Sequence, residues 1–177
     1  RDYKVTGVQT CALPILNIML VLLITVACAT PVSAQNIYFT DPVQAINATV
    51  EGSQDIVKQP KGNVISTGIL EISNPGGGEI GVYMQTLSHI EIDETVFGVY
   101  LDRWIESEER WANVANYKFT YNKENSPDED LTTKAISFNI VGQPVDCYYR
   151  LRGVHMVISG GEREMLSSRT DGILITK

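Results

Sequence analysis

The stretch Cys147–Ser159, with the sequence CYYRLRGVHMVIS, decides the fold. It is a long run rich in aromatic and β-branched residues, a composition typical of a β-strand. Turn-forming residues flank it, with Gly142 and Pro144 before it and Gly160 and Gly161 after it. We therefore predict that Cys147–Ser159 is one long strand at the centre of a sheet.

Seven other segments are β-rich, and most of them alternate apolar and polar residues as half-buried strands do. They cover residues 68–73, 79–88, 95–105, 110–121, 133–141, 163–169 and 173–176. The residues predicted to face the core are Leu70, Ile72, Ile80, Val82, Met84, Phe97, Val99, Leu101, Trp111, Tyr117, Phe119, Tyr121, Ile136, Phe138, Ile140, Tyr149 and Leu151. This pattern predicts an all-β antiparallel sandwich of seven or eight strands, immunoglobulin-like or fibronectin type III-like.

The first 34 residues are excluded from the predicted fold. Residues 5–15, VTGVQTCALPI, match the translation of a common sequencing adaptor, so we interpret residues 1–15 as an artefactual leader. Residues 16–27 form an almost wholly apolar run, which suits a signal peptide and is shorter than the roughly 20 residues of a membrane span. We predict a signal peptide over residues 16–34 with cleavage after Ala34, hence a secreted, extracellular protein. Lipidation of Cys28 is the alternative.

The rest of the chain is predicted to hold one domain. Residues 35–63 are interpreted as an extended linker or edge strand, and residues 64–177 as the β-sandwich domain. The formal net charge of −7 argues against nucleic acid, and against a membrane after signal cleavage, as partners. Of the three cysteines, Cys147 alone lies beyond residue 34, so a disulfide within the domain is excluded and pairing between molecules stays open.

Three motifs carry a resemblance to a known family. They are CYYRLRGVHMVISGGEREMLSSRTDGI at 147–173, ISNPGGGEIGVY at 72–83 and VYLDRW at 99–104. Together they resemble an uncharacterised family of small secreted proteins of Gram-positive bacteria, a domain of unknown function. The resemblance covers residues 62–177. It implies secretion and a β-rich fold, and it does not indicate any activity. Many relatives have a Cys where this chain reads LSH at 87–89, so the resemblance supplies no disulfide. The alternation at 149–153 is also similar to the F strand of fibronectin type III modules, which speaks to fold alone.

Two arginines and a tyrosine of the central strand form a first candidate site. Tyr148, Arg150 and Arg152 alternate with core residues, so we predict that they share the solvent face of the strand. There, two guanidinium groups and a phenol can hold a carboxylate or a sugar. The alternative is cross-strand pairing of the arginines with Asp102 on the neighbouring hairpin.

Aromatic residues form a second candidate site. Tyr83, Tyr100 and Trp104 are predicted to share an outer face, and exposed aromatic rings in a row stack on sugar rings in carbohydrate-binding modules. Beside Arg150 and Arg152 they would form a platform for an acidic sugar or a partner's carboxylate. Burial of these rings beneath a loop is the alternative.

Neither a catalytic nor a metal site is predicted. The two histidines, His89 and His155, lie in no GxSxG, HExxH or SxxK motif. Cys147 and His155 are a strand's length apart, about 26 Å at 3.3 Å per residue, too far for a catalytic pair. Acidic groups that a retaining glycosidase or a calcium ion would use are attributed to a solvated surface. They are Asp93, Glu94, Asp102 and the runs at 106–109 and 128–130.

These features predict a non-enzymatic binding or surface-interaction module outside the cell, with an unknown protein or glycan as its partner and no cofactor. A carbohydrate-binding module or a small extracellular hydrolase is the alternative.

Overall fold

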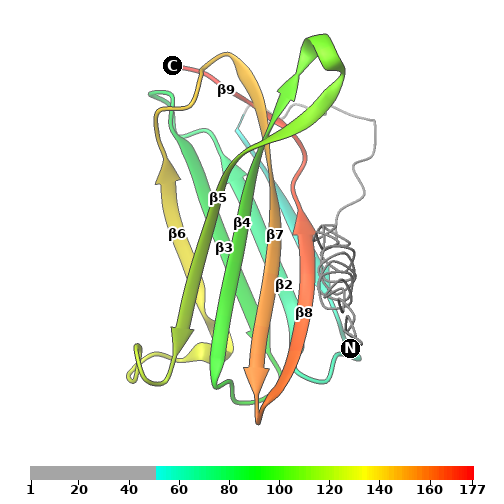
Figure 1. Cartoon of the computed structure of the whole chain (residues 1–177), viewed down its shortest axis with the longest axis vertical. Helices are drawn as coiled ribbons and strands as arrows, with labels where there is room; N and C mark the ends of the chain where they lie inside the picture. Colours follow the sequence, from blue (N-terminus) through cyan, green and yellow to red (C-terminus); the bar gives the residue numbers. More distant parts are fainter. Residues whose placement is uncertain (1–50) are drawn as a thin grey trace, which may run out of the picture. The chain divides into compact units, whose positions relative to one another are not determined.

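The computed structural model describes residues 51–177 (Figure 1). This part of the chain forms nine β-strands and two short 3₁₀ helices, η1 Glu106–Glu108 and η2 Leu131–Thr133. The strands are β1 Gly52–Lys58, β2 Ile65–Ser73, β3 Ile80–Ser88, β4 Glu94–Ile105, β5 Arg110–Asn122, β6 Ala135–Ile140, β7 Cys147–Ser159, β8 Glu162–Arg169 and β9 Ile173–Ile175. The predicted leader, signal peptide, cleavage after Ala34 and lipidation of Cys28 lie outside the described residues.

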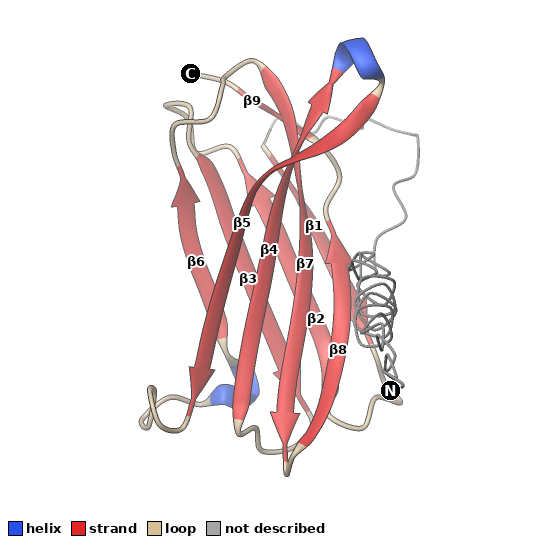
Figure 2. Ribbon diagram, viewed as in Figure 1, coloured by secondary structure: helices blue, strands red, loops and turns tan. Residues whose placement is uncertain are grey.

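The strands form two antiparallel sheets that face each other (Figure 2). The first sheet has the order β1-β2-β3-β6, and the second has the order β5-β4-β7-β8 with β9 also paired to β7. The predicted all-β antiparallel sandwich is therefore confirmed. The described residues contain nine strands rather than seven or eight, because β1 pairs along β2 as an edge strand. That strand begins at Gly52, within the segment interpreted as a linker or edge strand.

The order of the strands differs from the immunoglobulin order. In the immunoglobulin fold the second strand lies beside the fifth. Here β2 lies between β1 and β3, and β3 pairs on its other edge with β6. The likeness to that fold is thus one of architecture, two packed antiparallel sheets, and not of connection order.

Strand β7 is the centre of the second sheet, as predicted. Its bounds are Cys147–Ser159, and it pairs with β4 on one edge and with β8 and β9 on the other. Near its start the Tyr149 hydroxyl donates to the Pro144 carbonyl oxygen at 2.7 Å. Burial raises the pKa of this hydroxyl. The bond ties β7 to the loop that precedes it, in the manner of the tyrosine corner of immunoglobulin-like domains.

The core lies between the two sheets, where the inward side chains of both meet. Phe97, Val99 and Leu101 of β4 are fully buried, as are Tyr149 and Leu151 of β7. The remaining buried members of this main cluster are Leu70, Ile72, Ile80, Val82, Met84, Ile136, Ile140, Ile173 and Ile175. Complete burial of one such side chain stabilises the fold by about 1.5 to 3 kcal/mol. The predicted inward faces are confirmed for these strands.

One predicted inward residue, Trp111, lies on the opposite face. The register of β4 and β5 shifts at one point, because Leu101 pairs with Ala115 whereas Asp102 pairs with Asn113. Val114 is the extra residue of this β-bulge, and one extra residue reverses the faces of the strand beyond it. Tyr117, Phe119 and Tyr121 follow the bulge along β5 and pack against the core, while Trp111 precedes the bulge and points outward.

Candidate functional site

The outer face of the second sheet brings most of the predicted site residues together. Cross-strand partners share a face, and the register pairs Tyr100 with Arg152 and Asp102 with Arg150. Trp104 follows two residues after Asp102 on the same face of β4. The predicted proximity of Tyr100 and Trp104 to the two arginines is therefore confirmed by the register.

Of the two other predicted residues, one lies on this face and one does not. Tyr148 is on the same face of β7, opposite Leu174 of β9. Tyr83 belongs to β3 in the other sheet, so its predicted place beside Tyr100 and Trp104 is wrong. Alternation along a strand predicts the face of a residue but not the sheet to which the strand belongs.

The arginines share one buried carboxylate. Arg152 donates to Asp102 from Nε to Oδ2 at 2.7 Å and from Nη2 to Oδ1 at 2.9 Å, a two-pronged contact. Arg150 Nε donates to the same Oδ2 at 3.2 Å. The alternative of cross-strand pairing with Asp102 is thus confirmed. Asp102, Arg150 and Arg152 are 1%, 3% and 8% exposed, so the predicted solvent exposure of the two arginines is wrong.

Aromatic rings cover this charged cluster from outside. The Arg150 guanidinium carbon lies 4.6 Å from the centre of the Trp111 ring, and that of Arg152 lies 5.5 Å from the Tyr100 ring. Trp111 can do this because the bulge at Val114 turns it outward. Stacking of guanidinium on aromatic faces is favourable and shields the ion pairs from water. We therefore interpret the cluster as a structural element of the sheet.

Trp104 is half-buried at the edge of this cluster. Its indole Nε1 donates to Glu106 Oε2 at 2.8 Å, and its ring meets Trp111 edge-on at 5.5 Å between ring centres. A ring held at its edge by a tryptophan and at its nitrogen by a carboxylate is less free to stack flat on a ligand than the predicted platform requires.

Next to the cluster the outer face is hollowed around Gly98. The hollow has a volume of about 330 Å³. Its lining is largely apolar, with two polar side chains on β5. The lining residues are Val96, Gly98, Tyr100, Asn116, Tyr117, Lys118, Val154 and Met156. Gly98 lies between Lys118 on β5 and Val154 on β7, in the middle of the face.

The other glycines inside strands are explained by packing. A Cβ at Gly68 would lie 2.8 Å from Leu166, one at Gly81 would lie 2.2 Å from the Ser73 hydroxyl, and one at Gly153 would lie 2.6 Å from the Ser168 hydroxyl. Each of these distances is too short for a real Cβ contact. At those three positions a larger residue would displace a neighbouring side chain, so close packing accounts for the glycine.

Gly98 has no such explanation. A Cβ there would lie 3.5 Å from Val154 and 3.6 Å from the Tyr100 ring, which are ordinary contacts. The register runs without a shift through this point on both edges of β4, so no bulge requires glycine either. Glycine in a strand interior weakens the strand, and one use of such a glycine is to let a ligand or another backbone approach closely.

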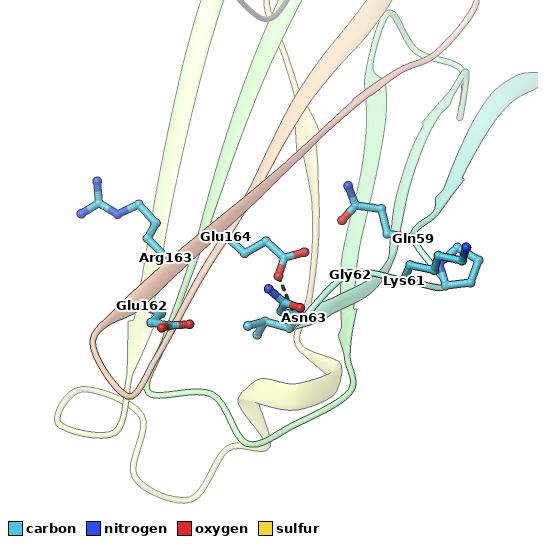
Figure 3. Close-up of a pocket in the computed structure, with 9 residues that line it drawn as sticks. Gln59, Lys61, Gly62, Asn63, Glu162, Arg163 and Glu164 are labelled. Atoms are coloured by element: carbon cyan, nitrogen blue, oxygen red, sulfur yellow. Dashed lines mark hydrogen bonds between the residues drawn. The ribbon is translucent and has the colours of Figure 1, made fainter.

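A larger hollow of about 610 Å³ lies between the β1–β2 turn and the start of β8 (Figure 3). Glu164 reaches from β8 toward the turn and accepts a hydrogen bond from the Val64 N–H at 2.7 Å. The Gln59 Oε1 atom is buried here without a hydrogen-bond partner. The lining residues are Gln59, Pro60, Lys61, Gly62, Asn63, Val64, Glu162, Arg163 and Glu164. Because the partly buried carboxylate of Glu164 already holds the turn, we assign this hollow a structural role.

His155, one of the two candidate catalytic histidines, is buried between the sheets. Its Nδ1 lies 3.0 Å from the Thr86 hydroxyl on β3, and its Nε2 lies 2.9 Å from the Ser168 hydroxyl on β8. Burial lowers the pKa of this imidazole to about 4. The contacts join the two sheets through a neutral ring that is 0% exposed, whereas His89 is exposed in the β3–β4 connection.

The remaining candidates are surface groups or parts of turns. Asp130 accepts from the Thr132 N–H at the start of η2, which lowers the pKa of its carboxyl. Cys147 is a free thiol packed at the edge of the core. Within residues 51–177, no three His, Cys, Asp or Glu side chains gather as metal ligands would.

Comparison with protein-family models and with curated proteins finds no match for this chain. In the described part of the chain no helix has the length and apolar character needed to cross a membrane.

Proposed function

We propose that this chain is a non-enzymatic extracellular binding module, and that its partner binds on the outer face of the β5-β4-β7-β8 sheet at the Gly98 hollow. The observation that carries the proposal is the strand glycine at position 98, which neither packing nor a bulge explains. A glycine there leaves room for a side chain of the partner to reach the sheet.

The surroundings of the hollow support this assignment. Val96, Val154 and Met156 supply apolar contact area, and Asn116 and Lys118 supply polar groups at one side. Ligand sites are typically apolar hollows with a few polar groups that fix orientation. The half-exposed ring of Tyr100 adds area without much conformational entropy to lose.

An array of extracellular proteins and glycans probed with the full chain tests the proposal. Gly98→Val projects a branched side chain into the hollow, and its Cβ has room. The variant is therefore expected to fold with an unchanged or higher thermal midpoint and to bind the partners found on the array at least tenfold more weakly. Ser137→Val places the same side chain on the exposed outer face of β6 and is expected to bind as the wild type does. Equal binding by wild type and Gly98→Val would overturn the proposal.

A further inference from the structure

The outer face of the second sheet is basic in an acidic protein. The chain has a formal net charge of −7. The outward residues of β4, β5, β7 and β8 nevertheless include more basic than acidic groups. The exposed basic residues are Lys118, Arg163 and Arg169, against the acidic Glu94. Arg150 and Arg152 are buried on this face and pair with Asp102.

The outer face of the other sheet shows no such excess. There the register places one basic residue, Lys58, and one acidic residue, Glu71, among the outward side chains of β1, β2, β3 and β6. The charges on the outer face of the first sheet therefore balance, whereas the outer face of the second sheet has an excess of basic residues and carries the Gly98 hollow. A face of one sign attracts a partner surface of the opposite sign and speeds its association.

Building on the proposed function, we infer that the partner is an acidic protein segment that inserts an apolar side chain into the Gly98 hollow. Val96, Val154 and Met156 form its apolar wall. Lys118 is the exposed basic residue directly beside Gly98, where it can meet a carboxylate next to the inserted side chain. Met165, 37% exposed and paired with Met156, extends the apolar strip onto β8.

The chemistry of the wall favours a protein segment over a glycan. The wall formed by Val96, Val154 and Met156 offers almost no hydrogen bonding, so sugar hydroxyls placed against it would lose water without replacement, which is costly. An apolar side chain gives up no hydrogen bond with water when it enters the hollow, and it gains apolar contact area. Methionine side chains also adapt their shape to apolar groups of a partner.

Three series of fluorescent peptides test the inference, each with a central Leu or Phe flanked by Glu, by Gln or by Lys. Anisotropy titrations with the full chain at low and high salt measure their affinities. The Glu-flanked peptides are expected to bind at least tenfold more tightly than the Gln-flanked ones, with the difference shrinking at high salt because ions screen exposed charges. Lys118→Glu is expected to remove the preference, and Lys58→Glu on the other sheet to retain it.

The outcomes separate this inference from the proposed function. Equal affinities across the three series, a preference for the Lys-flanked peptides, or no binding by any of them contradicts the inference. If Gly98→Val nonetheless abolishes binding of the partners found on the array, the proposed binding function is supported and the inference of an acidic partner is refuted. If no array partner responds to Gly98→Val either, both fail.

Discussion

The buried His155 makes the stability of the domain depend on acidity. Its imidazole has a pKa of about 4 in the folded protein, and burial is the cause, against about 6.5 in an unfolded chain. Between pH 4 and pH 6.5 the unfolded state therefore binds a proton on this imidazole that the folded state does not bind. The contribution of His155 to stability is fully present above pH 6.5, falls as the pH falls, and levels off below about pH 4.

The magnitude follows from the difference between the two pKa values. A difference of about 2.5 units at 1.36 kcal/mol per unit predicts a loss of about 3 kcal/mol by pH 4, of which about 2 kcal/mol is lost by pH 5. That is a large fraction of the 5 to 15 kcal/mol by which domains are usually stable. The groups in contact with the ring, the hydroxyls of Thr86 and Ser168 and the ring of Phe97, do not titrate in this range.

Urea denaturation of the full chain from pH 7.5 to pH 4 measures this loss, and His155→Leu isolates it from the carboxylates that also titrate. The variant is expected to be less stable at pH 7.5, because the Thr86 and Ser168 hydroxyls lose their partner. Its free energy of unfolding should change less between pH 6.5 and pH 4.5 than that of the wild type, by about 2 kcal/mol. Parallel curves for the two proteins would refute the reasoning.

Five further substitutions test the packing. Leu151→Ala is expected to lower the free energy of unfolding by about 2 to 5 kcal/mol in a denaturant titration, and Arg152→Ala by about 3 kcal/mol because it breaks a buried ion pair; a negligible loss for Arg152→Ala would show the guanidinium to be solvated. Asp102→Ala leaves two buried guanidinium groups beside each other and should cost at least as much as Arg152→Ala, with a smaller loss counting against the shared carboxylate. Gly153→Ala should lower the thermal midpoint, while Gly98→Ala leaves it unchanged or higher. A lower midpoint for Gly98→Ala than for Gly153→Ala would contradict the space described around the two glycines.

Much of the fold could be predicted from the sequence because strands carry a local signal. Alternation of apolar residues together with turn residues predicted eight of the nine strands of the described residues, and the bounds of β7 coincide with the predicted stretch. The edge strand β1 was less distinct, since it pairs on one side and its residues Ile56 and Val57 do not form a clear inward face. The order of the strands could not be predicted, because alternation says nothing about which strands become neighbours.

The candidate site was harder to predict because it depends on one irregularity. The bulge residue Val114 has no distinctive sequence, yet it turns Trp111 outward, and Trp111 in turn covers Arg150. Arg150 and Arg152 therefore lie on the predicted face of β7 but are buried there. Gly98 was overlooked for a related reason, since the space around a strand glycine is set by side chains of the adjacent strands.

The most direct test of the binding face is an amide chemical-shift map recorded as an array partner is titrated into the isotope-labelled full chain. Binding at the Gly98 hollow predicts shifts concentrated at Val96, Gly98, Lys118, Val154 and Met156, with the outward residues of β2 and β3 unchanged. Shifts confined to the β1–β2 turn, or to the loops at the ends of the sandwich, would contradict it.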